Sequence, residues 1–162
     1  TAWPDKPIKF VLSQPPGSGP DNVARLLGER LTKSLGQAIV IDNKPGGQNV
    51  IGAQAAARST PDGYTFYFAT TAALITNALL FKQLAYDPQK DFAPVGMVGY
   101  SPTLLVTNMS LPVRNLQDFI DLLRTTKLPL NYASAGEGTI PHLAAEMLLR
   151  KLQALKGTQG LS

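Results

Sequence analysis

Glycines and short polar side chains gather at four bends in the chain, residues 14–21, 45–49, 70–71 and 134–139. Each bend follows an apolar run of strand composition and precedes a stretch with helical spacing. A strand that enters a helix through such a turn leaves backbone N–H groups unpaired, with the positive end of the helix dipole behind them. This arrangement favours the binding of a small anion.

Patterns for nucleotide, metal and thiolate chemistry are missing. No glycine is followed by lysine and a hydroxyl residue, as a P-loop requires, and Asn22 or Pro141 stands where the third glycine of the dinucleotide fingerprint belongs. The chain has no cysteine and one histidine, His142. We therefore expect no cofactor and no metal. A hydrolase-like enzyme that uses His142 with Ser134 or Asp21 is an open alternative, although no G-x-S-x-G elbow supports it.

Asp21 is the acidic residue of the first bend. It could orient the bend or meet an amino group of a ligand, but an acid in the first turn of a helix is stabilised by the dipole in any case, by about 0.3–1 kcal/mol. We favour the structural role. The bends otherwise supply backbone donors and neutral side chains, which suit binding better than turnover.

The elements that position the first three bends form three strand-helix units. Strands are predicted over residues 8–12, 38–41 and 64–69, and each is followed by a helix. Parallel neighbours need a crossover that packs on the sheet, so we expect a parallel sheet with helices on both faces. Ligands bind beyond the carboxyl ends of such strands, where these bends lie. The apolar stripe of the first helix consists of Val23, Leu26, Leu27, Leu31 and Leu35.

The rest of the chain is predicted to hold three more strands and two more helices. Strands over residues 95–100 and 103–107 flank Ser101-Pro102, the expected hinge, and a short strand covers residues 130–133. Helices are expected around residues 116–123 and over residues 140–155, the second with Thr139 as a cap and Pro141 in its first turn.

Composition restricts the function classes. A hydrophobic content of 44% and a charged content of 16% are typical of a globular protein. The net charge of +4 comes from scattered lysines and arginines, which argues against nucleic acid as a partner. No apolar run approaches the ~18 residues of a membrane span, and no signal-peptide pattern opens the chain. We expect a mature or trimmed N-terminus.

Several motifs resemble one family, the periplasmic solute-binding proteins of tripartite tricarboxylate transporters, also called the Bug or TctC-like family. The matching stretches are Trp3-Pro4-x-Lys6-Pro7-Ile8, Pro16-Gly17 with Asp21 and Ala24-Arg25, Asn43-Lys44-Pro45-Gly46-Gly47 with Ile51-Gly52-Ala53, Pro61-Asp62-Gly63-Tyr64-Thr65, Tyr86-Asp87-Pro88-x-Lys90-Asp91-Phe92-x-Pro94-Val95 and Tyr132-Ala133-Ser134-x-Gly136-x-Gly138-Thr139-x-x-His142-Leu143. They occur in the family's order from residue 3 to about residue 150.

The resemblance implies an α/β fold of the type II periplasmic-binding-protein (Venus flytrap) kind, with three-layer α/β/α lobes. It implies a periplasmic protein that captures a small organic anion, such as a di- or tricarboxylate, an acidic amino acid or an aromatic carboxylate, and delivers it to a membrane permease. His142 is a possible support for the site. The ligand-binding positions implied by the family are Gln14, Pro15, Pro16, Gly17, Ser18, Asp21, Gly46, Gly47, Gln48, Asn49, Thr70, Thr71, Ser134, Ala135, Gly136, Gly138 and Thr139.

The sequence departs from the family in its first bend and in its length. Gln14 stands where the family usually has an aromatic residue, and Ser18 where it has a second glycine. Family members are about twice as long as this chain, and the resemblance ends after Leu149. We therefore expect a truncated fold, with an incomplete first lobe over residues 1–100 and the beginning of a second over residues 101–162. A fragment that binds nothing is a further alternative.

Overall fold

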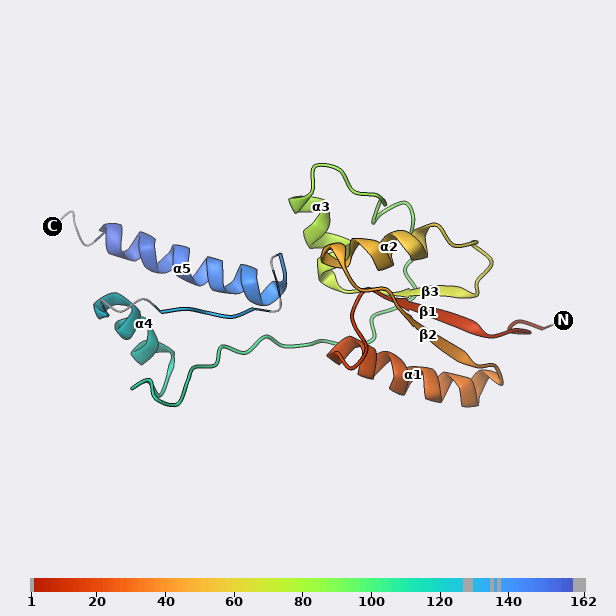
Figure 1. Ribbon diagram of the computed structural model, residues 1–162, viewed down its shortest axis with the longest axis horizontal. Helices are drawn as coiled ribbons and strands as arrows, with labels where there is room; N and C mark the ends of the chain where they lie inside the picture. Colours follow the sequence, from red (N-terminus) through yellow and green to blue (C-terminus); the bar gives the residue numbers. More distant parts are fainter. Residues whose placement is uncertain (1, 127–129, 135, 137, 159–162) are drawn as a thin grey trace. The chain divides into compact units, whose positions relative to one another are not determined.

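The computed structural model describes residues 2–126, 130–134, 136 and 138–158, with side chains as far as residue 153 (Figure 1). These residues form two compact units, Thr1–Gly96 and Met97–Ser162, and each is described by itself. The expected lobes, residues 1–100 and 101–162, stay a prediction. Within the described residues, no helix is both long enough and apolar enough to span a membrane.

A three-stranded parallel sheet with the order β2-β1-β3 lies at the centre of the first unit. Its strands are β1 (Ile8–Leu12), β2 (Ile39–Asn43) and β3 (Thr65–Phe68). Leu12 is in register with Asn43 on one side and with Phe68 on the other. The three strands therefore end at the same edge of the sheet, as the sequence predicted.

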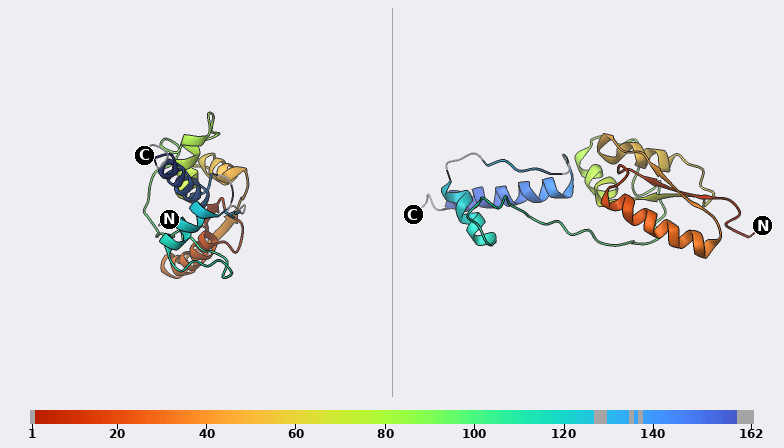
Figure 2. Two further views of the ribbon diagram at one scale, coloured as in Figure 1. Left: turned by 90° about the vertical axis from the view of Figure 1, so that its left-hand side faces the viewer. Right: turned by 60° about the horizontal axis from the view of Figure 1, so that its bottom comes forward.

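Helices cover both faces of this sheet, with α1 on one side and α2 on the other (Figure 1; right-hand view of Figure 2). Ile8, Phe10 and Leu12 of β1 form a buried cluster with Ala24 of α1. The helical elements of the unit are α1 (Gly19–Leu35), the 3-10 turn η1 (Gly47–Asn49), α2 (Val50–Ala57), the π-helical turn η2 (Ala72–Thr76) and α3 (Asn77–Leu80).

The buried face of α1 differs from the predicted stripe. Leu27, Leu31 and Leu35 pack against the core, but Val23 and Leu26 are exposed. Ala24 and Gly28 are buried in their place. The Cα of Gly28 approaches β2 so closely that an added Cβ would lie 3.2 Å from Cγ2 of Ile39. Small residues at the centre of the helix let it lie close to the sheet, and this turns Val23 and Leu26 outward.

The second unit contains α4 (Leu116–Thr125) and α5 (Ile140–Thr158), close to their predicted positions. Asn115 caps α4, because its side chain accepts a hydrogen bond from the backbone N–H of Asp118 at 3.0 Å. The predicted strands over residues 95–100, 103–107 and 130–133 are wrong, because the structure has no strand in any of these segments. A strand exists only with a hydrogen-bonded partner, and these segments have none in the described part of the chain.

Candidate functional site

Gln14 links the first three bends at the carboxyl edge of the sheet. It follows β1 and Ser13, and its Nε2 donates to Oδ1 of Asn49 in the second bend at 3.2 Å. The same nitrogen donates to Oγ1 of Thr70 in the third bend at 3.4 Å. The backbone oxygen of Gln14 accepts from Nδ2 of Asn43 at 3.0 Å. Bends that are far apart in the sequence therefore meet around one amide side chain.

Asp21 is buried beneath the first bend and stabilises it through hydrogen bonds. Its carboxylate is 1% exposed and accepts from Arg25 Nε at 2.9 Å, from the Gly17 backbone N–H at 2.8 Å and from Asn43 Nδ2 at 2.9 Å. The hydrogen bond from Arg25, followed by those from Gly17 and Asn43, lowers the pKa of Asp21 to about 2. These contacts agree with a structural role for Asp21.

The other residues of the first bend lie nearer the surface. Ser18 caps α1, and its Oγ accepts from the backbone N–H of Asp21 at 3.4 Å. The backbone oxygen of Pro15 accepts from the N–H of Ser18 at 3.3 Å, and Pro15, Pro16 and Gly17 are exposed. Gly17 has φ +82°, a value that favours glycine. The bend thus presents its proline-glycine backbone to solvent above a buried carboxylate.

The second bend holds an unusual backbone. All four residues of the run 46–49 have positive φ, and for Gln48 and Asn49 the values are 53° and 74°. Positive φ in residues other than glycine costs free energy, and such strain is concentrated at functional sites. Buried side chains hold the strained loop: Ser13 Oγ donates to the Asn49 backbone oxygen at 2.9 Å, and Asn77 Nδ2 donates to that of Gln48 at 2.8 Å. The side chain of Gln48 is exposed.

The third bend leads into the helical turn η2, which a hydrogen bond from the Tyr86-Asp87-Pro88 motif supports. Thr70 is half-buried, Thr71 is exposed, and the N–H of Leu74 donates to the Thr70 backbone oxygen at 3.2 Å. Tyr86, which is 5% exposed, donates from its hydroxyl to the backbone oxygen of Ala73 in η2. The Tyr86-Asp87-Pro88 motif therefore fixes the helix that follows this bend.

The fourth bend belongs to the second unit. Gly136 and Gly138 have φ +123° and +75°, and Oγ1 of Thr139 donates to the Gly136 backbone oxygen at 2.6 Å. His142 Nδ1 accepts from the Gly138 N–H at 3.1 Å, so the histidine supports the bend, and Oγ of Ser134 accepts from the Gly136 N–H at 3.3 Å. Ala135, another predicted ligand-binding residue, lies outside the described residues.

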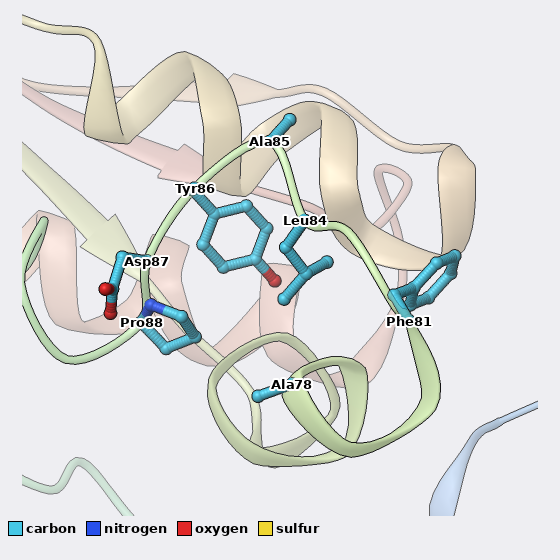
Figure 3. A pocket seen from close by; sticks show the side chains of 7 residues that line it. All are labelled: Ala78, Phe81, Leu84, Ala85, Tyr86, Asp87 and Pro88. Atoms are coloured by element: carbon cyan, nitrogen blue, oxygen red, sulfur yellow. The ribbon is translucent and has the colours of Figure 1, made fainter.

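A shallow hollow lies beside the helix that follows the third bend. Figure 3 shows the aromatic ring of Tyr86 and the side chain of Leu84 among the side chains that line it. Its lining residues are Ala78, Phe81, Leu84, Ala85, Tyr86, Asp87 and Pro88. None of them is a predicted ligand-binding residue, and Asp87 is the only one with a charged side chain. The predicted ligand-binding residues therefore lie outside the hollow.

Sequence reasoning missed two side chains that position the bends, Ser13 and Asn77, both 3% exposed. Ser13 Oγ also lies 2.6 Å from the hydroxyl of Tyr67, whose pKa burial raises to about 12. A serine directly after a buried strand could have been noticed. Asn77 gave no signal, because its partner is the backbone oxygen of a distant loop. Within the described residues, no cluster of three or more His, Asp or Glu could hold a metal ion.

The sequence matches a protein family described as "Tripartite tricarboxylate transporter family receptor" over residues 23–160. Among curated proteins, it is 37% identical over 149 residues to a UPF0065 protein of Bordetella bronchiseptica, an alignment that covers 92% of this chain and 44% of that protein. It is 35% identical over 146 residues to protein BugT of Bordetella pertussis, covering 90% and 45%. The chain therefore spans less than half the length of these relatives.

Solved structures give the same result. A protein from R. palustris, Rpa4515 with adipate, superimposes with a TM-score of 0.84 at 35% identity, covering 91% of this chain and 49% of that one. MatC from Rhodopseudomonas palustris with bound malate gives 0.79 at 32% identity, covering 93% and 51%. The periplasmic binding protein BugD gives 0.73 at 29% identity, covering 93% and 50%. The chain has the α/β fold of periplasmic binding proteins and carries about half of it.

Proposed function

The chain belongs to the tripartite tricarboxylate transporter receptor family, and from this premise we propose that it supplies the first binding loops of a periplasmic receptor for small organic carboxylates. The receptor captures its ligand outside the inner membrane and presents it to the membrane permease of the transporter. The ligand is a di- or tricarboxylate, an acidic amino acid or an aromatic carboxylate.

One observation carries this proposal, the meeting of three bends around Gln14 at the carboxyl edge of a parallel sheet. Ligands of open α/β sheets bind at this edge. The bends offer backbone N–H groups, hydroxyls and amides, which hold a carboxylate without a reaction. Ser134 and Thr139 of the fourth bend are proposed as further ligand-binding residues.

The enzyme alternative has less support. Nδ1 of His142 already accepts a backbone hydrogen bond from Gly138, and Arg25, Gly17 and Asn43 occupy the Asp21 carboxylate. A general base needs a free nitrogen or oxygen within reach of the proton that it removes. We therefore propose binding without turnover.

A thermal-shift experiment on the 162-residue chain tests the proposal. Adipate, malate, citrate, glutamate and benzoate are compared with sodium chloride at matched ionic strength and with dimethyl adipate, which has the length of adipate without its charge. We expect at least one carboxylate to raise the melting temperature, because a ligand at a hundred times its Kd stabilises the folded state by about 2.7 kcal/mol. Equal melting temperatures in all solutions would mean that the chain by itself does not bind these anions.

A loop variant locates the binding. Asn49→Gly removes the side chain that Gln14 contacts, and glycine accepts the observed φ of 74°. We expect weaker stabilisation by the carboxylate and little change in the melting temperature of the free protein. Gln37→Ala, at the amino end of β2 and so at the opposite edge of the sheet, is the matched control. Equal ligand effects in the two variants would place the anion elsewhere.

A further inference from the structure

The amide of Gln14 is incompletely paired. Its Nε2 donates to Asn49 and Thr70, but its Oε1 is buried and accepts no hydrogen bond from the described part of the chain. No other side-chain nitrogen or oxygen of the described residues is buried in this way. Buried acceptors are almost always paired, because an acceptor that leaves water and gains no donor in the folded protein costs free energy. This oxygen therefore needs a donor that the described residues do not supply.

The position of Gln14 indicates where such a donor would come from. The residue directly precedes the proline-glycine backbone of the first bend, and its amide contacts the second and third bends. The two bonds from Nε2, at 3.2 and 3.4 Å, are long for N–H···O hydrogen bonds. Gln14 as a whole is half-buried, and the terminal torsion of a glutamine is broad. The amide can therefore turn toward a ligand without a change in the backbone.

We propose that Gln14 makes the site selective for carboxylates that carry a hydrogen-bond donor, a hydroxyl or an ammonium group, beside the carboxylate. The ligand's carboxylate binds hydroxyls and backbone N–H groups of the second and third bends, and its donor pairs with Oε1 of Gln14. A ligand without the donor leaves the oxygen unpaired and binds more weakly. This inference rests on the proposed function and names the ligand class of the same site.

Matched ligands test the selectivity. Titrations of the 162-residue chain compare 2-hydroxyglutarate and glutamate with glutarate, and citrate with tricarballylate, which lacks the hydroxyl of citrate. We expect the wild-type chain to bind at least one donor-bearing ligand roughly 3- to 10-fold more tightly than its partner, the range that one hydrogen bond supplies. Equal affinities within every pair would overturn the inference and leave the proposed function standing. No binding of any carboxylate would count against the proposed function, and the inference would fall with it.

The variant Gln14→Met then distinguishes recognition of the ligand's donor by Gln14 from a purely structural role in linking the bends. Methionine has a similar length and flexibility, but its thioether sulfur is only a weak acceptor for the ligand's donor. If Gln14 recognises the donor, the preference falls to within about twofold of unity. If Gln14 only ties the bends together, both ligands of a pair lose affinity equally and the ratio is unchanged, which would overturn the inference. Gln37→Met is the matched control and keeps the wild-type ratio. Circular dichroism of each variant checks that the fold is intact, and the ratio within one variant is independent of its stability.

Discussion

Asp21 occupies the place at the start of α1 where the sequence suggested an external anion. Its carboxylate takes the backbone N–H of Gly17 and is paired with Arg25, so the protein's own acid satisfies part of the anion preference of this helix end. Asn43 adds a third donor and also ties β2 to Gln14. At the residue scale, the first bend is preformed around a buried charge.

The lowered pKa of Asp21 predicts an acid-dependent loss of stability. Arg25, Gly17 and Asn43 lower the pKa from an ordinary value of 3.8 to about 2, so the folded state favours the carboxylate. The resulting stabilisation is complete above about pH 4 and is lost as the pH falls through about 2. In thermal melts at steps from about pH 5 to about pH 2, the melting temperature should fall less for Asp21→Asn than for the wild type.

The control for this experiment is Asp121→Asn, which removes an exposed acid in α4. It should keep the pH profile of the wild type. At neutral pH, Asp21→Asn should melt at a lower temperature than Asp121→Asn, because Arg25 loses a charged partner. Parallel pH profiles for Asp21→Asn and the wild type would show that the carboxylate is not the source of the acid sensitivity.

Asn77 is predicted to hold the second bend in its strained conformation. Its side chain is 3% exposed and donates to the backbone oxygen of Gln48 at 2.8 Å. Asn77→Ala should lower the unfolding free energy by about 0.5–1.5 kcal/mol, because the part-buried hydrogen bond to the Gln48 backbone oxygen is lost. Hydrogen exchange of residues 46–50 should be faster than in the wild type, whereas exchange in β1 follows global stability alone. Asn22→Ala, which removes an exposed side chain with a 3.4 Å bond, is the control and should leave this loop unchanged.

At the scale of elements, the sequence predicted most of the first unit because its local and long-range signals agree. The apolar runs of β1, β2 and β3 are short, and the turn residues between them mark each end. The buried face of α1 was mispredicted in part, because the pattern counts large apolar residues whereas the close approach to the sheet depends on Ala24 and Gly28. Hydrophobic periodicity does not report how near two elements lie.

Gly52 is a second position where a small residue allows a helix to lie close to the sheet, and it yields a prediction. A glycine inside a helix costs roughly 1 kcal/mol relative to alanine, so helix propensity alone would favour Gly52→Ala. In the structure, an added Cβ would lie 2.5 Å from Ser13 Oγ, 2.9 Å from Ser13 Cα and 3.0 Å from the Lys44 backbone oxygen. Gly52→Ala should therefore destabilise the protein by about 1–3 kcal/mol in spite of its better helix propensity.

Urea or thermal denaturation measures this effect, with Gly19→Ala as the matched control in α1. An added Cβ at Gly19 would meet no atom within 4 Å, so this variant should be close to the wild type in stability. Because Ser13 also donates to Asn49, Gly52→Ala should in addition disturb the second bend. A Gly52→Ala protein as stable as Gly19→Ala would show that α2 can move away from β1 without loss.

At the scale of the whole molecule, the candidate site was only partly predictable. The sequence placed three bends at one edge of a sheet, and the contacts of Gln14 confirm that these bends meet. It gave no signal for Asn77, because the partner of this side chain is a backbone oxygen of a distant loop, and the position of Ser13 directly after β1 was the only sign of its role. Ligand contact by the bends and the role of the fourth bend stay predictions.

The failed strand predictions have a physical cause at this scale. Residues 95–107 have the composition of strands, but strand propensity reflects packing against neighbours more than an intrinsic preference of the backbone. Here Val95, Tyr100 and Val106 are 83%, 87% and 80% exposed. The chain spans less than half the length of its curated relatives, so much of what a relative could place beside this segment is not in the sequence.

This exposure predicts that the segment tolerates charge. Val95→Lys and Val106→Lys remove apolar side chains that contribute little to the core, so each should change the unfolding free energy by less than about 0.5 kcal/mol. Both should raise the concentration at which the chain stays soluble, because a run of exposed apolar side chains promotes aggregation. Thermal melts and light scattering over a concentration series measure the two effects. Leu79→Lys, at a position that is 82% exposed but outside the segment, should match them in stability without the same gain in solubility. A large loss of stability in Val95→Lys or Val106→Lys would mean that these side chains are packed in solution.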